Sequence, residues 1–117
     1  MVVGLGAGFG AVARLLVELI FADQARSLMV INLAGSLTLG LLVGLGLAAP
    51  QTPGRGLHRL HLLLGPGFLG GFTTFSTLMV EVIVSGSPNW VLLLALQLIA
   101  GVMLALIGVR IGGLLRR

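Results

Sequence analysis

Residues 65–77 read GPGFLGGFTTFST and lie in the middle of a long apolar segment of this 117-residue chain. The first seven of these residues include four glycines and one proline, residue types that interrupt helices. We therefore expect the helix to unwind between Gly65 and Gly71. At membrane depth, irregular backbone survives only where protein or an aqueous cavity satisfies its free carbonyl and amide groups. The interruption is thus the first indication of a functional site.

The composition around this stretch is that of a membrane protein. Hydrophobic residues make up 57% of the chain and charged residues only 9%, with a mean hydropathy of +1.17. Because one crossing needs about 20 apolar residues, four spans leave no room for a separate soluble domain. We predict an all-α, multi-pass protein of the cell (inner) membrane, with residues 1–117 forming a single four-helix domain. The spans are expected at about residues 2–21, 28–49, 60–84 and 90–113, separated by breaks at 22–27, 50–56 and 85–89.

The arginines predict the orientation of these spans. An even number of spans places both termini on one side, together with the loop between the second and third spans. That side carries five arginines, whereas the opposite side carries only Arg26. By the positive-inside rule, we expect the termini in the cytoplasm. The five arginines are Arg55, Arg59, Arg110, Arg116 and Arg117.

Several function classes are disfavoured. The net charge of only +4 gives weak support to nucleic-acid binding, and a chain without cysteine has no thiolate nucleophile. Residues 6–11 imitate a dinucleotide-binding fingerprint, but the alternating strands and helices that give it meaning do not follow. His58 and His61 have no carboxylate nearby in the sequence, so a metal site there is not favoured. Since no nucleophile is paired with a base, we expect no enzyme.

The second half of the interrupted segment carries the most specific chemistry. It places four hydroxyls beside two aromatic rings, at Phe72, Thr73, Thr74, Phe75, Ser76 and Thr77. Hydroxyls donate hydrogen bonds to an anion, and the positive edge of an aromatic ring tolerates one. The alternative is structural, because Ser and Thr often bond to the carbonyl four residues earlier in their own helix. Beside an interrupted backbone, we favour an anion pathway.

Other polar residues lie within the predicted spans. Helical spacing puts Asn32 and Ser36 on one face of the second span, where an interhelical hydrogen bond is the structural alternative. Arg14 lies well inside the first span, where a bare cation is costly. Glu18, four residues later, offers an ion pair, and the alternative is that Arg14 attracts anions to a vestibule. Glu81 and Gln97 have no partner that the sequence identifies.

Over nearly its whole length the chain resembles the Fluc (CrcB) fluoride channels. Residues 8–14 (GFGAVAR) are similar to the glycine-rich first span of that family, and residues 30–35 (VINLAG) to its asparagine motif. Residues 67–77 (GFLGGFTTFST) are close to its signature in a broken third span. The resemblance implies an antiparallel dimer of the dual-topology type that passively exports toxic fluoride through two pathways at its interface.

The resemblance also implies roles for particular residues. A central structural sodium ion would be held by backbone carbonyls of Gly70 and Thr73 from each subunit. The family lines its pathways with an asparagine, hydroxyls and phenylalanines, which correspond to Asn32, Thr74, Phe75 and Ser76. With Ser36 and Leu78, these residues form the expected ion pathway.

Two departures from the family pattern stand out. Leu78 occupies the position of a second pathway phenylalanine, so one polarised ring edge is missing and one pathway is weakened or silenced. Five arginines against one is also not the balance that identical, oppositely oriented subunits need. We therefore keep two hypotheses for the partner, a second copy of this chain or a differently charged paralogue.

Two other functions are compatible with four short spans. A small proton-coupled multidrug exporter needs a membrane-embedded carboxylate in its first span, and Glu18 lies too near the end of that span. A non-conducting partner subunit of a heterodimeric fluoride channel is the other alternative, and Leu78 makes it plausible.

Overall fold

The computed structural model describes residues 1–47 and 55–116, apart from the side chains of Arg55 and Leu57. Every secondary-structure element in this part of the chain is helical. Four helical stretches are long and apolar enough to cross a membrane, which makes the chain a multi-pass membrane protein. These stretches are Val2–Ile20, Gln24–Gly44, His58–Ser85 and Pro88–Leu115.

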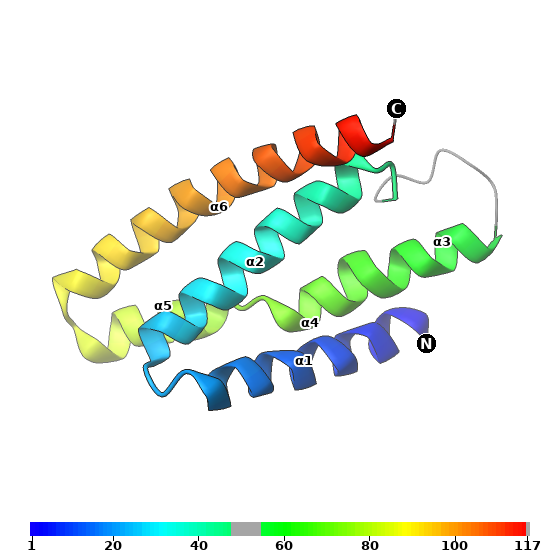
Figure 1. Cartoon of the computed structure of the whole chain (residues 1–117). Helices are drawn as coiled ribbons and strands as arrows, with labels where there is room; N and C mark the ends of the chain where they lie inside the picture. Colours follow the sequence, from blue (N-terminus) through cyan, green and yellow to red (C-terminus); the bar gives the residue numbers. More distant parts are fainter. Residues whose placement is uncertain (48–54, 117) are drawn as a thin grey trace.

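The first, second and fourth stretches are the continuous helices α1 (Val2–Ile20), α2 (Gln24–Gly44) and α6 (Pro88–Leu115). The third begins within α3 (Arg55–Leu62) and continues through the π-helix η1 (Leu63–Leu69), α4 (Gly70–Phe72) and α5 (Phe75–Ser85). In Figure 1, α2 runs alongside α6, while α1 runs alongside α3 and α4, and both chain termini lie at the same end of the molecule.

Side-chain caps set the turns at the opposite end. The Asp23 carboxylate accepts a hydrogen bond of 3.0 Å from the Ala25 amide, so α2 begins at Gln24 and not at the predicted residue 28. Gly86 ends α5 with a left-handed φ of 57°, a conformation that suits glycine. Ser87 then caps α6, with Pro88 in its first turn.

Only part of the predicted break between the second and third spans lies among the residues that the structure describes. It was expected at residues 50–56, of which 50–54 lie outside the described residues. Arg55 and Gly56 already belong to α3.

The prediction that the backbone unwinds between Gly65 and Gly71 is wrong. This stretch is helical, as the π-helix η1 followed by α4. The extended residues come later, at Thr73 (φ −77°, ψ 151°) and Thr74 (φ −145°, ψ 112°). Helix propensity fails at the glycines because tertiary packing overrides it. Two of them, Gly67 and Gly71, have no side chain and let the backbone lie directly against α1.

Glycines bring the helix backbones together in two pairs. A Cβ added at Gly6 would lie 2.9 Å from the Phe68 amide nitrogen of η1. One added at Gly108 of α6 would lie 2.7 Å from the Leu41 nitrogen of α2. Small residues at these positions therefore let the helices of this chain pack closely. The glycines in such close contacts include Gly6, Gly10, Gly40, Gly44, Gly67, Gly71, Gly108 and Gly112.

Substitution of Gly10 by alanine should destabilise the fold. The new methyl would meet the Phe68 carbonyl oxygen and lie 2.8 Å from the Phe72 nitrogen, so α1 must move away from the third span. We expect Gly10→Ala to cost about 1–3 kcal/mol and to lower the melting temperature in detergent. Gly8→Ala on the same helix is the matched control, since nothing lies within 4 Å of its added Cβ. Equal melting temperatures for the two variants would contradict this account of the packing.

Candidate functional site

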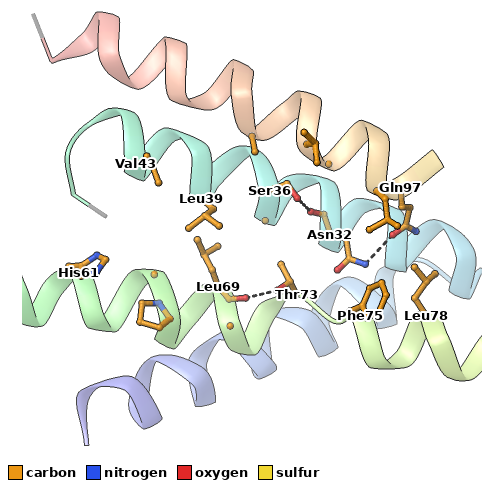
Figure 2. Close-up of a pocket in the computed structure, with 18 residues that line it drawn as sticks. Asn32, Ser36, Leu39, Val43, His61, Leu69, Thr73, Phe75, Leu78 and Gln97 are labelled. Carbon is orange, nitrogen blue, oxygen red and sulfur yellow. Dashed lines mark hydrogen bonds between the residues drawn. The ribbon is translucent and has the colours of Figure 1, made fainter. Parts of the chain in front are cut away.

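An open groove of about 680 Å³ lies between α2, α6 and the third span. Figure 2 shows His61 and Val43 toward one end of the groove and Asn32, Phe75, Leu78 and Gln97 toward the other. Most of the residues that line it are apolar, and its polar side chains come from three different spans. The residues that line it include Asn32, Ser36, His61, Gly70, Thr73, Phe75, Leu78, Gln97 and Val102.

Asn32 holds Thr74, the second of the two extended residues of the third span. The Thr74 backbone N–H donates to Asn32 Oδ1 over 3.0 Å, and Asn32 Nδ2 donates to the Thr74 carbonyl over 3.1 Å. One amide side chain thereby satisfies both backbone groups of a residue outside the helix, where unmet groups would be costly in a membrane. This contact joins residues 42 positions apart in the sequence.

Asn32 also binds Gln97 of α6. Its Nδ2 donates to Gln97 Oε1 over 3.0 Å, so both amide hydrogens of Asn32 are in use. Gln97 is only 6% exposed, and its Nε2 has no hydrogen-bond partner among the residues that the structure describes. Gln97 is the site residue whose role the sequence analysis missed. Its only signal was a polar side chain in the middle of an apolar span.

Two backbone carbonyls near Thr74 lack the N–H donor that a continuous helix would supply. In a continuous α-helix the Gly70 carbonyl would accept from the Thr74 N–H, which instead donates to Asn32. The Thr73 carbonyl would accept from the Thr77 N–H, which instead donates to the Thr74 hydroxyl oxygen over 3.3 Å. Gly70 and Thr73 both line the groove, and the Thr73 methyl fits against Gly35 of α2.

The remaining hydroxyls lie apart from the groove or bond locally. Thr74 is 5% exposed and caps α5, and its hydroxyl lies 2.8 Å from that of Thr77 and 3.4 Å from that of Ser76. Within the described part of the chain, Thr74 and Ser76 do not line the groove. Ser36 does, but its hydroxyl donates to the Asn32 carbonyl one turn earlier over 2.8 Å.

The aromatic rings divide between two environments. Phe75 lines the groove and is 56% exposed, so its ring is available to a bound ion or a second subunit. Phe72 instead stacks on Phe68, with ring centroids 5.8 Å apart and planes inclined by 13°. Leu78 lines the groove at the end near Phe75 and is 1% exposed.

Arg14 lies at a separate site. Its Nε is 3.7 Å from Glu18 Oε1, as the spacing of four predicted. Both residues line a second pocket of about 450 Å³ together with Gln24 and Thr77. Gln24 also supplies the partner of Glu81 that the sequence did not identify, through a 2.6 Å hydrogen bond from Nε2 to Oε1.

The groove is therefore lined by Gly70 and Thr73, whose carbonyls lack their helical donors, by the amide side chains of Asn32 and Gln97, and by the exposed ring of Phe75. Carbonyl oxygens suit a hard cation, whereas an N–H group and a ring edge suit an anion. Among residues 1–47 and 55–116, no group of three or more His, Asp and Glu side chains is close enough to hold a metal.

Comparison with known proteins places the chain in a family. The model of the family described as "CrcB-like protein, Camphor Resistance (CrcB)" matches residues 1–113. The chain belongs to the CrcB family. CrcB relatives named fluoride-specific ion channel FluC 1 occur in several bacteria. That of Ligilactobacillus salivarius is 36% identical over 120 residues, covering 96% of this chain and 97% of the relative.

Two further CrcB relatives with the same name are similar. That of Geobacillus kaustophilus is 37% identical over 118 residues and covers 94% of each chain. That of Corynebacterium jeikeium is 39% identical over 99 residues, covering 75% of this chain and 71% of the relative. No solved structure matches the chain significantly.

Proposed function

We propose that this chain is a fluoride-specific ion channel that lets fluoride leave the cytoplasm passively. The observation that carries the proposal is the groove, in which Asn32, Phe75 and Gln97 from three spans surround one volume. An amide N–H group and a ring edge can replace the water of a small, strongly hydrated anion. The names of the CrcB relatives support fluoride as that anion.

The direct test is fluoride release from liposomes that contain the purified full-length chain. We expect rapid release when an ionophore dissipates the membrane potential, with no proton gradient, and slow release from protein-free vesicles. Proton-driven export of lipophilic cations would instead support a multidrug exporter. No transport of either kind would support a non-conducting partner subunit.

The exporter remains the less favoured alternative. Such a mechanism needs a carboxylate that is free to exchange protons with substrate inside the first span. Glu18 lies two residues from the end of α1, is paired with Arg14 and has a side chain 39% exposed. The non-conducting alternative rests on Leu78, which places an aliphatic side chain in the groove.

We place a structural sodium ion at the freed carbonyls of Gly70 and Thr73. Each carbonyl lacks the donor that a continuous helix would supply, because Asn32 and the Thr74 hydroxyl take those donors. Backbone oxygens without N–H partners fit a hard cation that is held and not transported. When bound, the ion supplies positive charge that offsets these carbonyl dipoles.

Removal of sodium should therefore abolish transport. After prolonged dialysis into a buffer with an organic cation in place of Na⁺, we expect fluoride release to fall at least about tenfold. Return of Na⁺ should restore it. Release that stays unchanged through the exchange would contradict a structural role for the ion.

We propose that the groove is completed by a second, antiparallel subunit. Gly70 is exposed in the single chain, and its free carbonyl would be costly against lipid. Exposed apolar side chains surround it, among them Phe75 at 56% and Val102 at 61% exposure. A partner that covers this face would satisfy both the carbonyl and the apolar surface.

The partner is either a second copy of this chain or a differently charged paralogue. Of the five arginines expected at the terminal side, Arg117 lies outside the described residues, as does the side chain of Arg55. The count predicts one preferred orientation, with the termini in the cytoplasm, and is the reason to consider a paralogue. Labelling of the termini from each side, with the chain expressed alone, tests this. Equal populations of both orientations would favour the homodimer.

A further inference from the structure

The acidic side chains of this protein all lie at one end of the helical bundle. Glu18, Asp23 and Glu81 are the only three in the sequence, and they belong to the end where α1 meets α2 and α5 meets α6. Each is paired there, the first two with arginines over 3.7 and 3.3 Å and the third with a glutamine over 2.6 Å. The other end, which holds both chain termini and the start of α3 (Figure 1), carries arginines and no acidic side chain.

Arg110 is a cation inside the fourth span at this second end. It lies five residues before Leu115, the last residue of α6, which corresponds to about 7.5 Å along the helix axis. The residue is exposed, and no ion pair joins it to any residue that the structure describes. A bare guanidinium at this depth is costly. Because all the acidic side chains lie at the opposite end, an ionic partner can come only from outside the chain.

Arg110 faces away from the rest of the subunit. On α6, Gly108 and Gly112 pack against the α2 backbone, where a Cβ added at Gly108 would lie 2.7 Å from the Leu41 nitrogen. Arg110 is two residues from each glycine and therefore lies about 200° around the helix from them. It is also absent from the α6 residues that line the groove. Its face of α6 is thus separate from the one that we propose a second subunit covers, and it is left to lipid.

A notch lies beside Arg110 on the surface of α6. It has a volume of about 340 Å³ and is lined by Val109, Arg110, Gly113 and Leu114. A Cβ added at Gly113 would meet nothing within 4 Å, so the missing side chain leaves open space next to the guanidinium. Leu114 is 67% exposed beside it. The notch therefore suits an amphipathic ligand, with an anionic group at the arginine and hydrocarbon against the apolar side chains.

We infer that this notch binds an anionic phospholipid, with Arg110 as the contact to its headgroup phosphate. A guanidinium can donate two parallel hydrogen bonds to a phosphate, and basic residues near the membrane surface attract anionic lipids. The uncompensated arginines of this end favour a lipid with a net negative charge over a zwitterionic one. Arg116 is engaged elsewhere, since its guanidinium carbon lies 2.8 Å from a Cβ added at Gly46, just beyond α2.

The test is a lipid titration of the purified full-length chain in detergent micelles. Phosphatidylglycerol is compared with phosphatidylcholine of the same acyl chains. A lipid that binds the folded chain raises its melting temperature, so each titration gives the lipid fraction that produces half of the shift. We expect a larger shift with phosphatidylglycerol. For Arg110→Gln the half-saturating fraction should rise about fivefold, whereas Arg110→Lys, which keeps the charge, should stay closer to the wild type. Gly113→Leu fills the notch and should also weaken binding.

Arg26→Gln is the matched control, because Arg26 is an exposed arginine at the opposite end of the bundle. It should titrate like the wild type, and a loss equal to that of Arg110→Gln would show that net charge and not this notch governs binding. A wild-type titration by folded Arg110→Gln would overturn the inference. If that variant does not fold, Gly113→Leu decides, and an unchanged titration counts against the notch.

Two further outcomes concern the ligand. Equal shifts from the two lipids would overturn the assignment to an anionic lipid. Inorganic phosphate, added to the chain in phosphatidylcholine micelles at the same concentration, should produce no shift, and a shift equal to that of phosphatidylglycerol would assign the site to a free anion. Fluoride release plays no part in these measurements, so their failure would leave the proposed channel function untouched.

Discussion

Asn32→Leu is expected to lower the fluoride release rate at least about a hundredfold. The substitution removes three hydrogen bonds, two to the Thr74 backbone and one to Gln97. Each unmet buried group costs about 1–3 kcal/mol, and about 1.4 kcal/mol corresponds to a factor of ten. The Thr74 carbonyl loses the Asn32 N–H that donates to it. Without Asn32, Thr73 and Thr74 are no longer held in the extended conformation that leaves the Gly70 and Thr73 carbonyls without helical donors. Liposome release assays measure the effect.

A second substitution on the same helix provides the control. Thr38 is exposed, and its hydroxyl donates only to the Ala34 carbonyl of its own helix, over 2.8 Å. Thr38→Val should change both release and melting temperature little, within about 0.5 kcal/mol in stability. If Asn32→Leu conducts at the wild-type rate, the network around Thr74 is not needed for transport.

Phe75→Leu is expected to lower release on the order of tenfold or more while leaving stability nearly unchanged. The Phe75 ring is 56% exposed, so its loss removes little packing within the subunit. It lines the groove, where its positive ring edge can replace water around an anion and an aliphatic side chain cannot. The fluoride release rate and the melting temperature of each variant are measured together, so that a loss of transport is distinguished from a loss of stability.

Phe9→Leu is the matched control for this prediction. Phe9 is 68% exposed on α1 and does not line the groove within the described part of the chain. Release by the Phe9 variant should equal that of the wild type. An equal loss in both variants would mean that exposed aromatic rings act through the membrane, and the pathway role of Phe75 would then fail.

The structure agrees with the family pattern at Phe75, but it separates other residues of the expected ion pathway from the groove. Asn32, Ser36 and Leu78 lie on the groove with Phe75, whereas Thr74 and Ser76 form a hydroxyl cluster at the start of α5. Arg14 belongs to the second pocket. The buried Thr74 hydroxyl therefore serves first to cap α5, and Ser76 is exposed beside it.

Much of this protein was decided by sequence alone. The apolar content predicted that the chain spans a membrane and how many times it does so, because a run of about 20 apolar residues has few alternatives to a membrane-spanning helix. The motifs around Asn32 and Phe75 predicted the family to which the chain belongs. These signals are local, since each depends on residues within a few helical turns.

Only the tertiary structure decided where the third span leaves the helical conformation. The sequence favoured Gly65–Gly71, but contact with α1 keeps those residues helical, and the extended residues are Thr73 and Thr74. Asn32 stabilises them from another helix, 42 positions away. Gln97 likewise gained a role only through its contact with Asn32 across 65 positions. Such pairings depend on which helices pack together, and no local pattern of residue types encodes that.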